Sequence, residues 1–224
     1  MLEWVGLGVR GRGGRRRQEL PGRHPHRSRP ISRKVHVAVR EPLPMYPAYE
    51  LDDPLKSILI PADRLQERVR ELGQEMSEVY RGRVPLLVSI LKGGVVFLVD
   101  LMRAMSVPHH IDFLQVSSYE GGTKSTGTVR ILSDLGTNIA GRDVVLVEDI
   151  VDTGLTLSYL LKQLEIRQPR SLRVCALLSK KDVPRIQVPI DFLGFEIPNE
   201  FVVGYGLDYD EKYRNLPYIG VLDL

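Results

Sequence analysis

The stretch Val144–Thr156 gathers the residue types that could do chemistry in this chain. Four apolar residues lead into the adjacent acids Glu148 and Asp149, and Asp152 then precedes a Thr-Gly-Leu-Thr sequence. At the carboxyl end of a parallel strand, the next loop and helix N-terminus present free backbone N–H groups that suit a phosphate. Glu148 and Asp149 would then bind ribose hydroxyls, directly or through a magnesium ion.

The glycine and the hydroxyl groups of this stretch also favour a phosphate-binding site. Gly154 permits close approach of the backbone, and Thr153 and Thr156 supply hydroxyl donors. The alternative is purely structural: Asp152 would be the acidic N-cap of an ordinary helix. That alternative is weakened because an acid pair ends the apolar strand and a hydroxyl lies two residues beyond the glycine.

The surrounding elements must position these side chains. The sequence predicts strands at 85–91, 111–118, 129–132, 143–148 and 172–178, and helices at 61–79, 95–105 and 153–168. Because continuous apolar strands alternate with helices, we expect an α/β fold with a mostly parallel, twisted sheet flanked by helices on both faces.

Composition narrows the class of protein. The 224 residues are 43% hydrophobic and 26% charged, as in one globular domain. No apolar run approaches the ~20 residues that span a bilayer, so we expect no membrane association.

The lone Cys175 excludes an internal disulfide and a cysteine-based zinc site, and it indicates a reducing, cytoplasmic location. His109 and His110 lack a metal-ligand set and are expected at the surface or an interface.

Charge divides the chain in two. Residues 1–44 carry a net charge of +8 and residues 45–224 a net charge of −5. The first segment has almost no periodic apolar pattern, so we expect a disordered, Arg-rich extension at 1–48 and one folded domain at 49–224. The extension has three open explanations: a nucleic-acid-binding arm, a targeting segment, or a start site assigned upstream of a true start near Met45.

The stretch Val144–Thr156 resembles the phosphoribosyl-pyrophosphate-binding motif of the type I phosphoribosyltransferases. Over about residues 55–222 the chain is similar to the hypoxanthine-guanine phosphoribosyltransferases of that superfamily. The matching segments are Leu91–Gly94, Ser118–Tyr119 with Ser125–Gly127, Leu177–Lys181, Gly194–Pro198, Phe201–Tyr209 and Tyr213–Arg214. The resemblance implies the type I phosphoribosyltransferase fold, with a small hood region and a flexible lid loop.

The resemblance also implies the residues that bind 5-phosphoribosyl 1-diphosphate. They are Lys92, Gly93, Gly94, Glu148, Asp149, Asp152, Thr153, Gly154, Leu155, Thr156 and Arg214. Residues 92–94 would form a pyrophosphate loop with a cis peptide between Leu91 and Lys92, although a plain strand-to-helix turn is the alternative. Ser118 and Tyr119 would begin a lid, reaching to Gly127, that keeps water from the reacting centre.

The purine-binding residues implied by the resemblance are Lys180, Phe201, Val202 and Asp208. Lys180 would donate to the exocyclic oxygen of a 6-oxopurine, since a lysine offers donors only. Phe201 would stack on the purine, the backbone of Val202 would contact its edge, and Asp208 would lie near its 2-position. Lys181 is expected to be an ordinary exposed residue.

The implied reaction moves the 5-phosphoribosyl group from 5-phosphoribosyl 1-diphosphate to N9 of hypoxanthine or guanine, a purine-salvage step that gives IMP or GMP and pyrophosphate. Mg²⁺ is the implied cofactor, with Glu148, Asp149 and Asp208 as its ligands, because it neutralises the departing pyrophosphate. Asp152 would be the general base toward purine N7. A homodimer or homotetramer is expected.

Other interpretations stay open. Adenine and xanthine phosphoribosyltransferases would share the phosphate residues, but Lys180 disfavours adenine and leaves xanthine as an additional substrate. A regulator of the same fold that binds RNA or DNA is disfavoured by the acidic domain, so nucleic acid is not an expected partner. Leu155 and Glu200 stand where some family members have lysine, which bears on diphosphate affinity and purine preference.

Overall fold

The computed structural model describes residues 55–118, 129–181, 183 and 186–222. All of them belong to one compact unit. The Arg-rich extension at 1–48 and the lid residues from Tyr119 to Gly127 lie outside the described residues. The disorder of the first, the boundary at residue 49 and the closing motion of the second therefore stay predictions.

Six strands form the larger sheet, in the order β4-β3-β2-β5-β6-β7. Their bounds are β2 (Leu86–Leu91), β3 (His110–Ser118), β4 (Val129–Ser133), β5 (Asp143–Val151), β6 (Ser171–Lys180) and β7 (Phe192–Ile197). Every neighbouring pair is parallel except β3 with β4. The predicted α/β fold with a mostly parallel sheet is confirmed.

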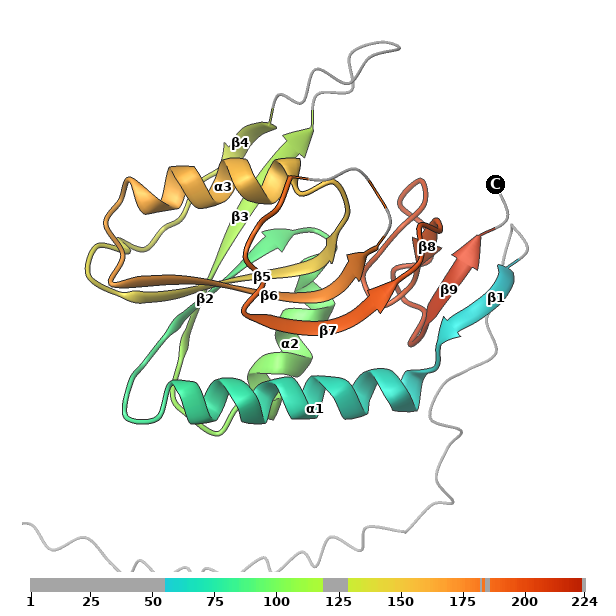
Figure 1. Ribbon diagram of the computed structural model, residues 1–224, viewed down its shortest axis with the longest axis horizontal. Coiled ribbons are helices and arrows are strands. Elements are labelled where there is room, and N and C mark those ends of the chain that lie inside the picture. Colours follow the sequence, from blue (N-terminus) through green and yellow to red (C-terminus); the bar gives the residue numbers. More distant parts are fainter. Residues whose placement is uncertain (1–54, 119–128, 182, 184–185, 223–224) are drawn as a thin grey trace, which may run out of the picture. The chain divides into compact units, whose positions relative to one another are not determined.

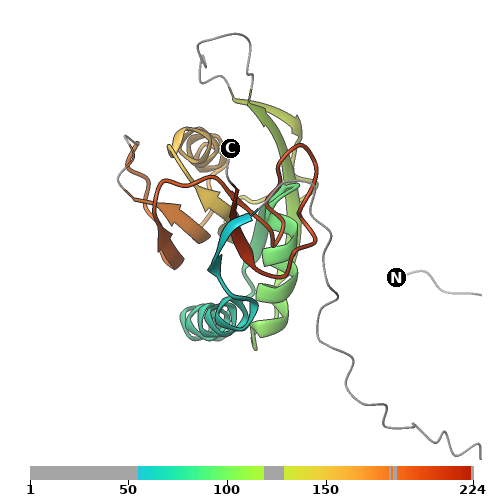
Figure 2. The ribbon, with the colours of Figure 1, turned by 90° about the vertical axis from the view of Figure 1, so that its right-hand side faces the viewer.

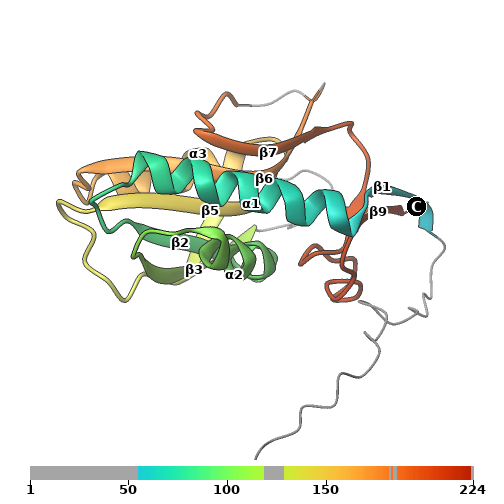
Figure 3. The same ribbon diagram turned by 90° about the horizontal axis from the view of Figure 1, so that it is seen from below.

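Helices cover both faces of this sheet. Helices α1 (Ala62–Val79) and α2 (Gly94–Ala104) lie on one face, and α3 (Leu155–Glu165) lies on the other (Figures 1 and 3). The side chains of β5 alternate between the two cores: Val145 packs with α1 and α2, and Leu146 packs with α3. The strand is apolar throughout this part because both of its faces are buried. Among the described residues, no helix is both long and apolar enough to span a bilayer.

A smaller sheet joins the two ends of the described chain. Strands β1 (Leu55–Ile60), β9 (Ile219–Leu222) and β8 (Val202–Val203) pair antiparallel in that order. This sheet lies beyond the carboxyl ends of β6 and β7, and β1 runs beside β9 (Figures 1 and 2). It is the small hood region that the resemblance implied, although no local pattern predicted its strands.

Three boundaries differ from expectation in ways that affect the site. Strand β5 continues to Val151 instead of ending at Glu148, because its last residues pair with β6. The two acids therefore lie on the strand. Helix α3 begins at Leu155 instead of Thr153 and ends at Glu165. Strand β6 extends to Lys180, which fixes this lysine at the carboxyl end of the sheet.

Candidate functional site

The predicted site residues meet where β2, β5 and β6 end. Lys92 follows β2, Glu148 and Asp149 lie near the end of β5, and Lys180 is the last residue of β6. Parallel strands place their carboxyl ends at one edge of a sheet, which is where α/β folds bind ligands. The sheet therefore brings together residues from three separate sequence motifs.

A pocket of about 160 Å³ opens at this edge. Its walls come from β2, β3, β5 and the start of α3. The lining residues are Ile90, Val116, Glu148, Ile150, Val151, Asp152, Thr153, Gly154, Thr156 and Leu157. Five of the residues predicted for the diphosphate substrate thus line one pocket. Leu155 is not among the lining residues, and its side chain is exposed.

Helix α3 begins at this pocket without a capping side chain. Gly154 is its N-cap, with a φ of 75° that favours glycine, and a Cβ there would lie 2.6 Å from the Ile186 carbonyl oxygen. The Leu155 N–H makes only a long hydrogen bond, 3.5 Å, to Thr153 Oγ1. The interpretation of Asp152 as the helix cap is therefore wrong, and the first amides of α3 suit an anion.

Asp152 instead contacts Lys180. The ammonium of Lys180 donates to Asp152 Oδ2 at 3.1 Å. The lysine side chain is 11% exposed and the aspartate side chain 49%, so a largely buried cation holds a carboxylate that solvent can reach. This contact joins the phosphate motif to the predicted purine motif. Lys181 is exposed, as expected.

The two acids of β5 are shielded from solvent to different extents, because Glu148 is buried and Asp149 is half-buried. Burial, with a smaller contribution from the charge of Asp149, raises the pKa of Glu148 well above its usual value. Burial also raises the pKa of Asp149 to about 6. Within the part of the chain that the structure describes, Glu148 Oε2 is buried without a hydrogen-bond partner. Buried carboxylates of this kind are stabilised in the ionised form by a cation.

These carboxylates fit a magnesium ion. Mg²⁺ prefers hard oxygen ligands and is usually held by one or two carboxylates together with substrate phosphates. The described residues contain no group of three or more Asp, Glu, His or Cys arranged to hold a metal alone. Glu148 and Asp149 supply two carboxylates of the kind that Mg²⁺ prefers.

The turn after β2 packs closely against Asp149. Its Leu91–Lys92 peptide bond is cis, as the resemblance implied. A Cβ on Gly93 would lie 1.7 Å from Asp149 Oδ2, a distance that no side chain can occupy. Helix α2 then begins at Gly94 without a capping side chain. Gly93 thus allows the turn to pack against Asp149, and the uncapped first turn of α2 leaves helix amides available to an anion.

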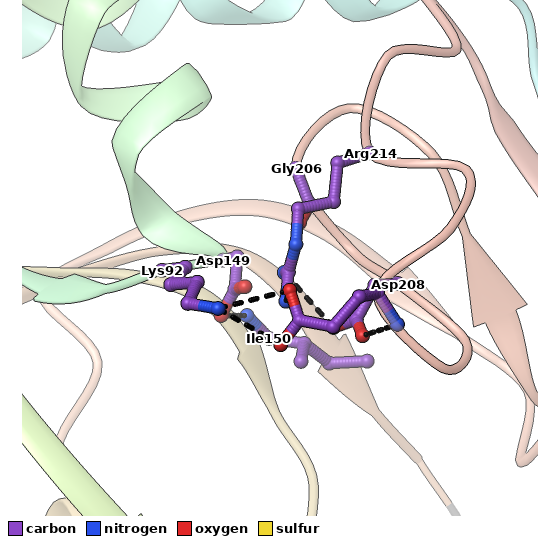
Figure 4. Close-up of polar contacts among 7 residues, drawn as sticks. Lys92, Asp149, Ile150, Gly206, Asp208 and Arg214 are labelled. Atoms are coloured by element: carbon purple, nitrogen blue, oxygen red, sulfur yellow. Dashed lines mark hydrogen bonds and ion pairs between the residues drawn. The ribbon is translucent and has the colours of Figure 1, made fainter.

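Lys92 and Arg214 come from different segments and turn toward each other (Figure 4). Arg214 Nη1 lies 2.9 Å from Asp208 Oδ1 and donates to the Gly206 carbonyl oxygen. Both cations also contact Glu211. Sequence reasoning missed Glu211, and its only signal is the three-residue spacing 208, 211, 214 within one loop.

The other predicted residues take several positions. Phe201 is 41% exposed and packs edge-on against Tyr209, with ring centroids 5.6 Å apart. Val202 is buried at the start of β8, and Ser118 ends β3 with its backbone opposite Val129. Tyr119 lies outside the described residues.

The remaining polar residues singled out by sequence lie at or near the surface. The Glu200 carboxylate lies 3.6 Å from the Lys56 ammonium, and both side chains are exposed. His110 is exposed and contacts Arg142, whereas His109 is partly buried with its Nδ1 near the Val107 carbonyl oxygen. The surface placement expected for the two histidines fits His110 better than His109.

Comparisons with known proteins agree on one family. A model of the phosphoribosyl transferase domain matches residues 61–210. The hypoxanthine-guanine phosphoribosyltransferase of Mycobacterium avium is 53% identical over 186 residues, which cover 80% of this chain and 92% of that protein. That of Streptococcus thermophilus is 46% identical over 172 residues, covering 77% and 96%. The structure of a hypoxanthine phosphoribosyltransferase from Staphylococcus aureus superposes with a TM-score of 0.72 at 44% identity, over 75% of this chain and 92% of that chain.

Proposed function

Since the chain belongs to the hypoxanthine-guanine phosphoribosyltransferase family, we propose that it transfers the 5-phosphoribosyl group of 5-phosphoribosyl 1-diphosphate to N9 of hypoxanthine or guanine. The products are IMP or GMP and pyrophosphate. The contact between Asp152 and Lys180 is the observation that carries this proposal. It brings the acid of the phosphate motif to the lysine of the purine motif, as a transfer between two bound substrates requires.

The pocket at the start of α3 would bind the 5-phosphate. The amides of the uncapped helix and the hydroxyls of Thr153 and Thr156 would donate to its oxygens, and the helix dipole would favour its negative charge. Glu148 lines the same pocket, where its carboxylate would face the ribose. The phosphate would thus fix the position of the sugar relative to the edge of the sheet.

The pyrophosphate would lie against Lys92, Arg214 and the amides of Gly93 and Gly94. Glu148, Asp149 and Asp208 would hold Mg²⁺, which when bound neutralises the negative charge that develops on the departing group. Asp208 is ion-paired with Arg214, so it would exchange this partner on binding. Displacement at the anomeric carbon needs such charge neutralisation because negative charge leaves with the pyrophosphate.

The purine would lie between Lys180 and Phe201. Lys180 would donate to the 6-oxo group, the exposed ring of Phe201 would stack on the base, and the backbone of Val202 would contact its edge. Asp152 would accept the proton of purine N7 as N9 bonds to the ribose carbon. Its partial exposure leaves room for the base to reach it.

Several properties go with this proposal. Ser118 and Tyr119 would start the lid over the reacting centre, and xanthine is a further candidate substrate beside hypoxanthine and guanine. We also propose that the protein forms a homodimer or homotetramer and that it is cytoplasmic. The burial of the lone Cys175 on β6 supports a structural role for this thiol rather than a disulfide.

A turnover assay tests the substrates directly. With 5-phosphoribosyl 1-diphosphate and Mg²⁺ held constant, we expect turnover with hypoxanthine and guanine, little with adenine, and loss of turnover when a chelator removes Mg²⁺. Adenine as the preferred base would overturn the assignment of Lys180. Absence of turnover with all four bases, xanthine included, would overturn the proposed function.

The substitution Lys180→Gln tests the purine half of the site. The amide keeps a donor but loses the charge, so kcat/KM for hypoxanthine and guanine should fall by the equivalent of about 1–3 kcal/mol. The KM for 5-phosphoribosyl 1-diphosphate should change much less. Lys181→Gln is the matched control, because the neighbouring lysine is exposed. Equal losses in the two variants would remove Lys180 from the base pocket.

A further inference from the structure

Glu211 is an exposed acid that lies between the two cations proposed for pyrophosphate. Its Oε1 and Oε2 lie 2.9 Å and 3.0 Å from Lys92 Nζ, and Oε2 lies 3.2 Å from Arg214 Nη2. Lys92 comes from the turn after β2 and Arg214 from the loop after β8 (Figure 4). One carboxylate is therefore shared by two cations that are distant in sequence.

The backbone of the loop aims Glu211 at this position. Its φ of 62° is unusual for a residue with a side chain, and its N–H donates to Asp208 Oδ2 at 2.9 Å. Asp208 is in turn paired with Arg214. The Glu211 side chain, by contrast, is 64% exposed and is held by its ion pairs. The carboxylate can therefore leave the cations while the backbone of the loop stays in place.

A carboxylate bridging two cations is the same kind of ligand as a pair of phosphate oxygens. Lysine and arginine bind both groups by charge-assisted hydrogen bonds. Arg214 Nε is buried and makes no hydrogen bond to any described residue, so this guanidinium retains a donor that the carboxylate does not use. A diphosphate carries more oxygens and more negative charge than a carboxylate, so it can replace Glu211 at the two cations.

We propose that Glu211 is an internal competitor of pyrophosphate: its carboxylate occupies Lys92 and Arg214, and the diphosphate group of the substrate displaces it. The inference rests on the proposed function, because it requires that these two cations bind pyrophosphate. Glu211 thus sets the affinity for 5-phosphoribosyl 1-diphosphate. By returning to the cations it also favours release of the pyrophosphate product.

The size of the effect follows from the exposure of the ion pairs. An exposed pair contributes from nearly nothing to a factor of about five in an equilibrium constant. Glu211 makes two such contacts, with Lys92 and Arg214. Their loss should therefore strengthen binding of the diphosphate group by about threefold to tenfold.

The experiment compares Glu211→Gln with Asp210→Asn. Both changes remove one negative charge from the same exposed loop, but no contact joins Asp210 to either cation in the described structure. Calorimetry with inorganic pyrophosphate and Mg²⁺ gives the Kd, and initial rates give the KM for 5-phosphoribosyl 1-diphosphate. We expect both constants to fall about threefold to tenfold in Glu211→Gln and less than twofold in Asp210→Asn, with the KM for hypoxanthine unchanged.

A second comparison tests the partner. In a Lys92→Ala background, Glu211→Gln should strengthen pyrophosphate binding by a smaller factor, because one of the two contacts is already gone. An equal factor in both backgrounds would show that Glu211 acts without Lys92 and would overturn the inference.

The remaining outcomes are distinct. Weaker pyrophosphate binding in Glu211→Gln would mean that Glu211 organises the two cations for pyrophosphate, and it would overturn the inference. Equal effects of Glu211→Gln and Asp210→Asn would mean a general effect of charge, and they would overturn it as well. A wild-type protein that binds pyrophosphate but turns over no purine would overturn the proposed function and leave the competition intact. A wild-type protein that binds no pyrophosphate would overturn both.

Discussion

Asp152 and Lys180 form the contact on which the proposed chemistry depends. The carboxylate accepts a hydrogen bond from the lysine but remains half exposed, so it can also contact a substrate. The lysine is nearly buried, and its direction is therefore fixed by packing as well as by charge. At the scale of single residues, the centre of the site is an ion pair in which Lys180 is nearly buried and Asp152 faces the pocket.

Asp152→Asn should lower kcat by about 10²–10⁴, the usual contribution of a general base. The amide keeps the shape of the side chain and can still accept a hydrogen bond from Lys180, but it cannot take a proton. Binding of 5-phosphoribosyl 1-diphosphate should be largely retained, which calorimetry can measure beside kcat. Near-normal turnover of a folded variant would show that Asp152 positions the substrate and is not the base.

Gly93→Ala should reduce kcat/KM by about 10²-fold, because the added Cβ would overlap Asp149 Oδ2 and move either the turn or the carboxylate. The φ at Gly93 is −57°, so the backbone itself tolerates alanine and the effect is purely steric. Gly136→Ala is the control: a Cβ there meets no atom within 4 Å. Comparable losses in both variants would contradict the packing argument.

Strand β5 carries a structural acid at one end and the site acids at the other. At its start, the buried carboxylate of Asp143 accepts hydrogen bonds from Arg170 at 2.5 Å and from Ser171 at 2.6 Å. The hydrogen bond from Arg170, stronger than the opposing effect of burial, lowers the pKa of Asp143. At its other end, burial raises the pKa of Glu148 and Asp149. The same strand thus holds one acid whose pKa is lowered by an ion pair and two proposed site acids whose pKa values are raised by burial.

Asp143→Asn should destabilise the fold by about 1–3 kcal/mol at neutral pH, since the amide lacks the negative charge that strengthens the hydrogen bonds of this buried group with Arg170 and Ser171. A lowered folded-state pKa gives stability that is present above the unfolded value of about 3.9 and is lost as pH falls through the folded value. The difference between wild type and variant should therefore shrink as pH falls below about 4. Urea unfolding at several pH values measures it.

Asp134→Asn is the control for this change. Asp134 pairs with Arg167 at 2.8 Å, but its side chain is 53% exposed. Its loss should cost less than about 1 kcal/mol. An equally large loss at Asp134, or a loss at Asp143 that does not depend on pH, would show that the burial of the Asp143 carboxylate is not what makes its ion pair stabilising.

Removal of residues 1–44 should leave both melting temperature and turnover unchanged. This segment carries a net charge of +8 with almost no periodic apolar pattern, so we expect it to add no packing to the domain. A chain that starts at Met45 is compared with the full chain by calorimetry and by turnover of hypoxanthine. Unfolding of the shorter chain, or a change in its oligomeric state, would contradict the predicted disorder of the extension.

The sequence by itself predicted the fold class, the motif at 144–156 and five strands of the larger six-stranded sheet, but it did not predict β7. Strand β5 and helix α1 are read from patterns of apolar residues that repeat within a single element, so no distant contact is needed to recognise them. The role assigned to the motif 144–156 likewise depended on residues adjacent in the chain. The family resemblance, now supported by the match over residues 61–210, added Lys180 to the predicted site.

The tertiary structure alone decided what depends on distant pairing. Leu55 pairs with Leu222, and the small sheet has strands of two to six residues that carry no period of their own. Lys92 meets Glu211, and Gly93 is pressed against Asp149, through contacts between segments that are far apart in the chain. Such contacts depend on how helices and strands pack against one another. The local pattern of apolar residues does not tell which side chains, distant in sequence, will meet in the folded chain.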